Sequence, residues 1–346
     1  MPRDPVSRPS PAPPGEAVPG VLFAGIGDEA GRELEQQTAA ITALGWQLIE
    51  LRSVGGVALS ELDERAFGSC VERLAEAGLG TACVDSRIAD WSRPISQGIE
   101  QDILELDRLG ERCPALGTRY VRVMSYPNDG WDEADWGREV IRRMRLLAGR
   151  AADLGLVLLH ENCAGWAGRS ARRMLRLLAE IDSPALRILF DTGNGIAYQY
   201  ETYDVLRELL DQQPESVAHV HVKDAVGAGD RTAYTLPGTG ESRVADCLRL
   251  LLDRDFTGVW SIEPHLSLRP HESRTELGED GPELFVEYGR RLEELVAAEL
   301  AGTRKEENHA HVHGRTEVHR RADPVGRASA AEAARAPHRR AAGGPG

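Results

Sequence analysis

Four stretches of this sequence decide its fold: VLLHEN (157–162), RILFDTGN (187–194), VAHVHVKD (217–224) and VWSIEPH (259–265). Each begins with a short apolar run and ends in residues that can bind a metal ion. The residues at these ends are Glu161, Asp191, His221 and Glu263. They are separated in the sequence by 30, 30 and 42 residues, which is the length of one strand–helix unit of a parallel α/β fold. We therefore expect the four side chains at the carboxyl ends of parallel strands, where barrels of this type keep their chemistry.

Strand-like and helix-like segments alternate over the whole of residues 20–301. Strands are predicted at 21–26, 47–51, 80–86, 120–124, 156–160, 187–191, 217–222 and 259–263. Helices are predicted at 33–44, 62–77, 95–113, 133–154, 170–181, 203–212, 244–254 and 282–299. A doubly wound sheet gives a similar alternation, but it has about five or six strands and a glycine-rich first turn, and GIGDEAG (25–31) lacks the third glycine. Eight units in one domain favour a closed (β/α)8 barrel, the TIM barrel.

The two ends of the chain differ from the barrel in composition. Residues 1–19 are rich in proline and contain no apolar core of a secretory signal, so we expect a disordered leader. Residues 302–346 have no apolar periodicity, so we expect a disordered basic tail. Because this tail holds nine Lys or Arg and five Asp or Glu, and the leader holds two of each, residues 20–301 carry a net charge of −18 against −14 for the whole chain. A barrel this acidic argues against nucleic acid as the substrate.

Hydropathy and cysteine usage indicate where in the cell the protein is expected. No run of about 18 apolar residues is present, so we expect no membrane span. The five cysteines form no C-x-x-C pair, which predicts reduced thiols and a cytoplasmic protein. Cys163 follows the HEN stretch, and we interpret it as a small residue filling a strand end rather than as a nucleophile.

The four strand-end residues form a mixed oxygen and nitrogen ligand set. Three carboxylates and one imidazole suit Mn²⁺ first, with Mg²⁺, Co²⁺ and Zn²⁺ as alternatives, and one such ion is expected. His219 and His221 are two residues apart and share a strand face, and we choose His221 as the ligand because it is nearer the carboxyl end. His160 is expected to face the helices instead. Asp28 and Glu29 could reach the barrel mouth or be solvated loop acids.

The motifs HEN, DTGN, HVHVKD and SIEPH, in this order and spacing, resemble the xylose isomerase-like TIM-barrel superfamily. That group includes sugar and sugar-phosphate isomerases and epimerases, inosose dehydratases and isomerases, and endonuclease IV. GIGDEAG and IELR (49–52) are similar to its sugar isomerase/epimerase and inositol-catabolism branch. The resemblance covers residues 21–298, and it implies the same barrel.

The resemblance also implies roles for the four residues. By analogy with ketose 3-epimerases, Glu161 and Glu263 would bind the metal and exchange the substrate proton, whereas Asp191 and His221 would be ligands only. This chain departs from those epimerases in having Gly227 where they have an arginine and Asn194 where they have a histidine. The departures leave the ketohexose 3-epimerase reaction itself in question.

Four further residues are candidates for substrate binding: Lys223, Trp166, Arg87 and His265. Lys223 is interpreted as a cation or acid facing the substrate, or as the salt-bridge partner of Asp224. Trp166, together with Trp91, Arg87 and Arg93, could hold a sugar or pack at the barrel mouth. The loop PGTGESR (237–243) could present backbone N–H groups to a ligand oxygen or phosphate, or simply begin a helix.

The predicted function is that of a metal-dependent isomerase or epimerase that acts on a sugar, cyclitol or glycoside-derived substrate. A divalent cation polarises a C–H bond next to a carbonyl, so that a carboxylate can remove the proton and form an enediolate. A lyase on the same scaffold, dehydrating an inosose or cleaving a 3-oxo-glycoside, would share the first step. An endonuclease IV-like phosphodiesterase is a weaker alternative because that branch uses more histidines. A homo-oligomer is possible.

Overall fold

The computed structural model describes residues 18, 20–266 and 281–318. The chain divides into two units, residues 1–301 and 302–346, and the barrel belongs to the first. The predicted leader, apart from Val18, lies outside the described residues, and so does the tail beyond Val318. Within the described residues, no helix combines the length and apolar character needed to cross a membrane.

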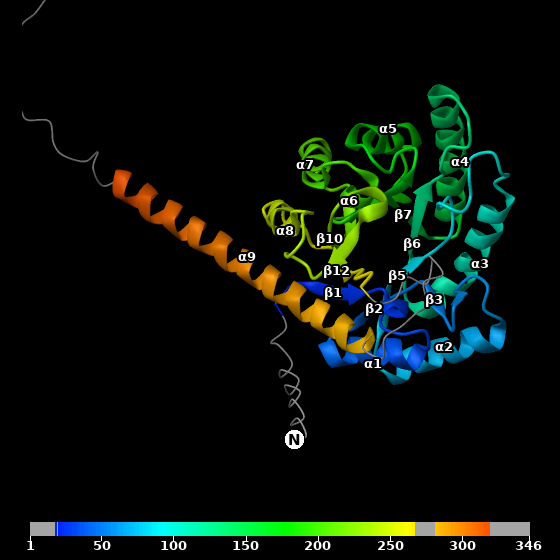
Figure 1. The fold of residues 1–346 in the computed structure, drawn as a ribbon, viewed down its shortest axis with the longest axis horizontal. Helices are drawn as coiled ribbons and strands as arrows, with labels where there is room; N and C mark the ends of the chain where they lie inside the picture. The colour runs from blue at the N-terminus through cyan, green and yellow to red at the C-terminus, as the bar shows by residue number, and fades with distance from the viewer. Residues whose placement is uncertain (1–17, 19, 267–280, 319–346) are drawn as a thin grey trace, which may run out of the picture. The chain divides into compact units, whose positions relative to one another are not determined.

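Eight parallel strands form one sheet in the order β1-β12-β9-β8-β7-β6-β5-β2 (Figure 1). These strands are β1 (Leu22–Gly25), β2 (Leu48–Leu51), β5 (Gly80–Asp85), β6 (Tyr120–Ser125), β7 (Val157–Gly165), β8 (Leu186–Asp191), β9 (Val217–Val222) and β12 (Val259–Ile262). A parallel bridge between Ile26 and Glu50 links the end of β1 to β2, the two outermost strands of this order. The sheet therefore closes on itself, and the prediction of a (β/α)8 TIM barrel is confirmed.

A helix follows each barrel strand in the chain. They are α1 (Leu34–Leu44), α2 (Glu64–Glu76), α3 (Glu100–Leu116), α4 (Glu133–Asp153), α5 (Ala171–Ile181), α7 (Thr202–Gln212), α8 (Val244–Leu252) and α9 (Gly281–Val318). Local sequence determines where several of them begin and end: the carboxylates of Asp63 and Asp132 accept hydrogen bonds from backbone N–H groups in the first turns of α2 and α4. Gly45 and Gly117 end α1 and α3 in the left-handed conformation that glycine favours.

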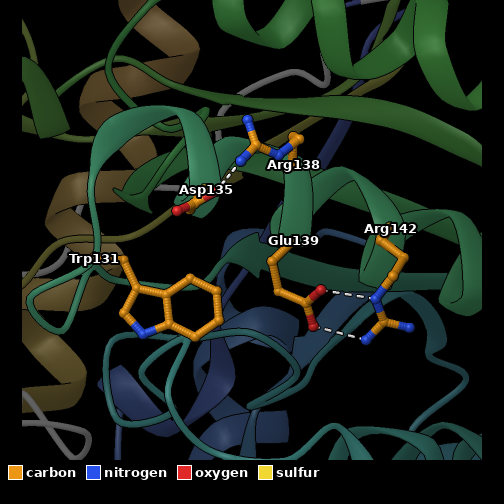
Figure 2. A pocket seen from close by; sticks show the side chains of 5 residues that line it. All are labelled: Trp131, Asp135, Arg138, Glu139 and Arg142. Atoms are coloured by element: carbon orange, nitrogen blue, oxygen red, sulfur yellow. Dashed lines mark hydrogen bonds and ion pairs between the residues drawn. The ribbon is translucent and has the colours of Figure 1, made fainter.

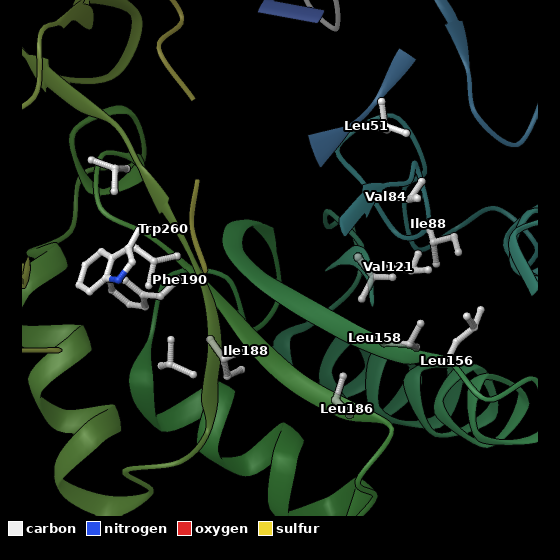
Figure 3. Close-up of a cluster of buried hydrophobic side chains, with 14 of the residues drawn as sticks. Leu51, Val84, Ile88, Val121, Leu156, Leu158, Leu186, Ile188, Phe190 and Trp260 are labelled. Atoms are coloured by element: carbon white, nitrogen blue, oxygen red, sulfur yellow. The ribbon is translucent and has the colours of Figure 1, made fainter. Parts of the chain in front are cut away.

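The main apolar core lies between the strands and the helices. Figure 3 shows Leu158, Ile188, Phe190 and Trp260 pointing from the barrel strands into this layer. Because side chains alternate along a strand, the residues between them face the barrel interior. Cys83, Leu159 and Leu189 form a small apolar cluster there, and Glu161 and Asp191 follow two residues later on the same faces of β7 and β8. The strand pattern thus directs the metal-capable side chains inward, at the carboxyl ends.

Three features differ from the sequence prediction. Two antiparallel hairpins, β3–β4 (Ser53–Val54, Val57–Ala58) and β10–β11 (Asp224–Val226, Ala233–Thr235), follow β2 and β9, and a short helix α6 (Asn194–Tyr198) follows β8. The third helix begins at Glu100 rather than at residue 95, because the apolar Ile95 is buried in the preceding loop, where its N–H bonds the Pro127 carbonyl. These strands and the helix are too short for periodicity to reveal them.

The last described helix includes the first residues of the predicted tail. Helix α9 is described from Gly281 to Val318, so residues 302–318 belong to it. The residues after Val318 lie outside the described ones, and the disordered tail predicted for residues 302–346 stays a prediction.

Candidate metal centre

The four predicted ligands meet at one end of the barrel. One ligand atom from each of Glu161, Asp191, His221 and Glu263 can be chosen so that all four lie within 4.8 Å of one another. Glu161 and His221 lie on β7 and β9, Asp191 is the last residue of β8, and Glu263 directly follows β12. The strands are neighbours in the order β12-β9-β8-β7, so their carboxyl ends bring the side chains together. All four residues are buried.

The ring of His221 is oriented for metal binding. Its Nε2 lies 3.1 Å from Glu50 Oε1, whereas Nδ1 is buried without a hydrogen bond. Nδ1 points at the carboxylates, 3.4 Å from Glu263 Oε2 and 3.8 Å from Glu161 Oε1. A buried ring nitrogen without a hydrogen bond, facing two acidic ligands, fits a divalent cation. Burial alone would lower the pKa of His221, but the charges of Glu50, Glu161 and Glu263 raise it well above its usual value.

Lys223 lies inside the same cluster. Its Nζ is 3.0 Å from Asp191 Oδ2 and donates a hydrogen bond to Glu263 Oε2. Burial alone would lower the pKa of Lys223, but Asp191 and Glu263 raise it well above its usual value, so the side chain is an ammonium ion. Burial raises the pKa of Asp191 to about 6, despite the opposing charge of Lys223. The alternative in which Lys223 pairs with Asp224 is wrong.

Asp224 instead organises the glycine-containing loop 237–243. Its Oδ2 accepts hydrogen bonds from the N–H groups of Gly238 and Gly240, at 2.8 and 2.9 Å, and its Oδ1 accepts one from Ser242 at 3.1 Å. A side chain at position 240 would collide with the Asp224 carboxylate and the Ala225 carbonyl, which explains the glycine. These N–H groups already bind a carboxylate of the chain itself, so the prediction that the loop presents them to a ligand is not supported.

Two buried arginines hold the glutamates of the cluster. Arg122 on β6 places NH1 3.1 Å from Glu161 Oε2, and Arg52 after β2 places NH1 3.3 Å from Glu263 Oε1. Burial alone would raise the pKa of Glu161, but His221 and Arg122 lower it to about 2. Lys223 and His265 likewise lower the pKa of Glu263 well below its usual value, against the effect of burial. Both glutamates are therefore ionised at neutral pH.

These two arginines and Glu50 were not among the residues predicted for the site. Glu50 and Arg52 belong to IELR, which entered only through the family resemblance, and Arg122 stands in the apolar strand YVRVMS. A charged residue within a predicted buried strand was the available signal, because such a residue needs a buried partner. Asn194 was identified only as a departure from the epimerases, and its Nδ2 donates to Glu161 Oε1 at 3.0 Å.

The acids of the first strand end reach the barrel mouth and are not solvated. Asp28 is 2.8 Å from Arg52 NH2, and Glu29 is 3.1 Å from the same atom. Glu29 also accepts hydrogen bonds from the backbone N–H and from Nδ1 of His265, at 2.6 and 2.8 Å. His265 Nε2 lies 3.8 Å from Glu263 Oε1, so this candidate does adjoin the cluster.

Other candidates lie elsewhere. Trp166 is buried, its Nε1 donates to Glu133 on α4 at 3.0 Å, and Arg176 covers its ring, so the packing alternative describes it. Arg87 is half-exposed and donates to Ser92. Trp166 therefore packs against α4, as the packing alternative expected. The assignment of Arg87 to the substrate site stays a prediction.

Two further predictions concern residues next to Glu161. His160 is buried with neither ring nitrogen hydrogen-bonded, consistent with its predicted orientation toward the helices. Burial, reinforced by the charge of Glu161, raises the pKa of the Cys163 thiol to about 12. A thiol that stays protonated at neutral pH is a poor nucleophile, which favours the structural role predicted for Cys163.

A shallow hollow on the surface is formed by Trp131 and the polar face of α4 (Figure 2). Its other lining residues are Asp135, Arg138, Glu139 and Arg142. The arginines are paired with the acids three residues earlier on the same helix. The hollow includes none of the four clustered ligands, and its charged groups satisfy one another.

Comparison with known proteins places this geometry in a family context. The family model described as xylose isomerase-like TIM barrel matches residues 38–287. A fructoselysine 3-epimerase of Escherichia coli O157:H7 is 25% identical over 131 residues, which is 37% of this chain and 45% of that protein. A 2-epi-5-epi-valiolone 7-phosphate 2-epimerase of Actinoplanes is 29% identical over 146 residues, which is 42% of this chain and 50% of that protein. The matches thus span about half the length of these relatives.

Solved structures extend the similarity to nearly the whole barrel. A xylose isomerase-like TIM barrel protein from Mycobacterium smegmatis, solved in complex with magnesium, superposes with a TM-score of 0.61 at 16% identity. The match covers 81% of this chain and 97% of that one. At this level of identity the likeness concerns the fold.

Proposed function

Because this chain belongs to the xylose isomerase-like TIM barrel family, we propose that it is a divalent-metal-dependent epimerase or isomerase of a sugar or cyclitol. The observation on which this proposal rests is the cluster of Glu161, Asp191, His221 and Glu263, with the bare Nδ1 of His221 directed into it. The two partial relatives are epimerases by name, which supports the same class of reaction.

The four side chains would hold one metal ion, with Mn²⁺ preferred for a set of three carboxylates and one imidazole. When bound, the ion would polarise a carbonyl and its neighbouring hydroxyl, making the hydrogen on the carbon between them more acidic. Asp191 and His221 would serve only as ligands. Both come from the central strands, β8 and β9, of the four that form the cluster.

Glu161 and Glu263 would transfer the proton. Glu161 lies on β7 and Glu263 directly follows β12, and these two strands flank β8 and β9, so the glutamates approach the cluster from opposite sides. Both carboxylates are ionised and can accept a proton, and Arg122 and Arg52 fix one oxygen of each. Glu161 would remove the proton, and Glu263, after taking a proton from the Lys223 ammonium that it contacts, would deliver it to the opposite face of the enediolate and so invert the carbon. The proton held by Glu161 would then pass to solvent. Its return to the adjacent carbon instead would give an aldose–ketose isomerisation.

The polar lining favours a small polyhydroxylated substrate. Lys223, His265 and Asn194 surround the glutamates and can hydrogen-bond or neutralise substrate oxygens. Asn194 replaces the histidine of the ketose 3-epimerases, so the substrate need not be a free ketohexose. We include ketoses, sugar phosphates and cyclitols in the proposed class.

A lyase remains the second candidate because of one observation. The Lys223 ammonium touches both Asp191 and Glu263, so an acid is available beside the base that would remove the proton. Such an acid could protonate a departing hydroxyl or alkoxide after the same first step, and the product would be an enone or a released aglycone.

One experiment separates the outcomes. The protein is loaded with Mn²⁺ and incubated in D₂O with ketoses, ketose phosphates, inososes and 3-oxo-glycosides, and products are followed by NMR and mass spectrometry. Deuterium at one carbon together with a stereoisomer or an aldose–ketose pair supports the proposal. An enone or a free aglycone identifies the lyase. Absence of both exchange and turnover with metal bound contradicts proton transfer.

The Glu161→Gln variant tests the assignment of the base. It should retain the fold and lose turnover by about 10²–10⁴-fold, the contribution of a positioned general base. Glu139→Gln on α4 is the matched control, because it removes a carboxylate that pairs with Arg142 of its own helix (Figure 2) and does not belong to the cluster. Removal of the metal with EDTA should abolish turnover, and Mn²⁺ should restore it. Full turnover by Glu161→Gln would refute the role of this glutamate.

A further inference from the structure

One carboxylate in the barrel interior contacts both histidines of β9. Glu50 on β2 is completely buried. Its Oε2 lies 3.0 Å from His219 Nε2, and its Oε1 lies 3.1 Å from His221 Nε2. Because His219 and His221 are two residues apart on one strand, both rings enter the interior and meet the same carboxylate.

This contact crosses the barrel. In the sheet, β2 pairs with β5 and is bridged to β1, whereas β9 lies between β12 and β8. Neighbouring strands therefore do not impose the contact between Glu50 and the histidines. An isolated buried carboxylate would destabilise the fold, so the two imidazole N–H groups are its compensating partners.

The geometry has a consequence for the ligand atom of His221. An ionised carboxylate offers only acceptor oxygens, so both Nε2 atoms must carry the hydrogen. In the neutral ring of His221 the lone pair is then on Nδ1, the atom that faces Glu161 and Glu263 without a hydrogen bond. A metal-binding histidine generally has its other ring nitrogen held in this way, which sets its tautomer and orientation.

We propose that Glu50 is a positioning residue of the metal centre, which fixes His221 as the Nε2–H tautomer with Nδ1 as the metal ligand, and that His219 holds Glu50 in place from its other oxygen. This inference rests on the proposed function, because it assigns a role relative to the same metal. The inference also assigns a role to His219, which is not one of the four proposed ligands.

Glu50→Gln tests the role at nearly constant volume. The glutamine side chain has one acceptor oxygen, so it can accept from only one of the two Nε2–H groups, and its NH₂ opposes the other. The dissociation constant for Mn²⁺, measured by titration calorimetry on the full chain, should rise by about 10- to 100-fold. His219→Gln, which leaves the Glu50–His221 contact intact, should weaken Mn²⁺ binding less.

Glu105→Gln is the matched control. Glu105 on α3 is also a buried carboxylate and takes the same substitution, but its partners are Arg93, Ser60 and the backbone N–H of Arg87 rather than a histidine or one of the four ligands. This variant should change the Mn²⁺ dissociation constant by less than about threefold, well below the effect expected for loss of an outer-shell partner. Thermal unfolding of each variant verifies that the fold is retained.

The tautomer provides a readout that a purely structural role would not change. In ¹⁵N-histidine NMR of the Zn²⁺-loaded wild type, His221 should show a metal-bound Nδ1 and a protonated Nε2. Metal bound through Nε2 overturns the inference, even if Glu50→Gln does not fold. An unchanged Mn²⁺ affinity in folded Glu50→Gln also overturns it. A wild type that binds no divalent metal refutes the proposed function as well, whereas normal wild-type binding with an unaffected variant refutes only the role of Glu50.

Discussion

Replacing Asp224 by asparagine should destabilise the loop between β9 and α8. The carboxylate accepts hydrogen bonds from Gly238 and Gly240 on Oδ2 and from Ser242 and Ala225 on Oδ1. An asparagine whose oxygen replaces Oδ1 still accepts from the N–H groups of Ser242 and Ala225. Its NH₂ group, however, replaces Oδ2 and points at the N–H groups of Gly238 and Gly240. The substitution therefore leaves two backbone donors without an acceptor.

The magnitude follows from the burial of those donors. A donor left without its acceptor costs about 1–3 kcal/mol, and the two glycine hydrogen bonds are only partly buried, so water can compensate in part. We expect the free energy of unfolding to fall by about 2–4 kcal/mol, near the lower end of the range for two groups. Asp224→Ala should cost at least as much, because it also removes the acceptor of the Ser242 N–H.

Urea unfolding measured by circular dichroism tests this expectation. The midpoint should fall while the slope of the free energy against urea concentration stays constant. Asp246→Asn on α8 is the matched control, because its carboxylate pairs with Arg243 at an exposed site and should contribute less than about 1 kcal/mol. If Asp224→Asn were as stable as this control, the loop would not depend on the Asp224 carboxylate, and our reasoning would be wrong.

Two further predictions concern the core. Trp260 is 1% exposed, and its ring contacts the ring of Phe256 edge to face. Trp260→Ala should therefore lower the free energy of unfolding by about 3–5 kcal/mol in the same urea assay. A loss below about 1 kcal/mol, which is typical of a surface substitution, would contradict this packing. Burial raises the pKa of Cys70 to about 11 and that of Cys113 and Cys247 to about 12, so these thiols should resist Ellman's reagent at pH 8 in the native protein and react after unfolding. Because their folded pKa values exceed the unfolded value of 9.0, the stability they contribute is complete below pH 9 and is lost as pH rises through 11 to 12, which thermal unfolding against pH would show.

The barrel and the four clustered residues could both be predicted from the sequence, because both predictions depend on the pattern of apolar runs and the polar residues that end them. A parallel strand buried on both faces appears as a continuous apolar run, and a polar residue that ends such a run stands at the carboxyl end of a strand. Asp191 at the end of β8 and Glu263 after β12 could therefore be placed at one end of the barrel before the strands were known to be neighbours.

The supporting residues could not be predicted in this way. Arg122 and Glu161 are 39 residues apart, Arg52 and Glu263 are 211 apart, and Glu50 and His221 are 171 apart. No local pattern reports which of many charged side chains will meet inside a closed barrel. Charge within a buried strand indicates that a partner exists, but only the closed sheet identifies it.

The two halves of the barrel consequently have different roles in the proposed centre. The four ligands lie on β7, β8 and β9 or directly after β12. The residues that hold them come from the other half: Glu50 lies on β2, Arg52 directly follows β2, and Arg122 lies on β6. In the proposed function the four ligands would set proton transfer as the chemistry, but they would not choose among sugars, because the same carbonyl and hydroxyl are common to the whole class. Trp166 illustrates the limit: its position after a strand end suggested a place at the substrate site, yet its side chain packs against α4. We therefore expect substrate choice to depend on Lys223, Asn194 and His265, which lie beside the glutamates, and substitutions there should change which compound in the panel is converted before they abolish metal binding.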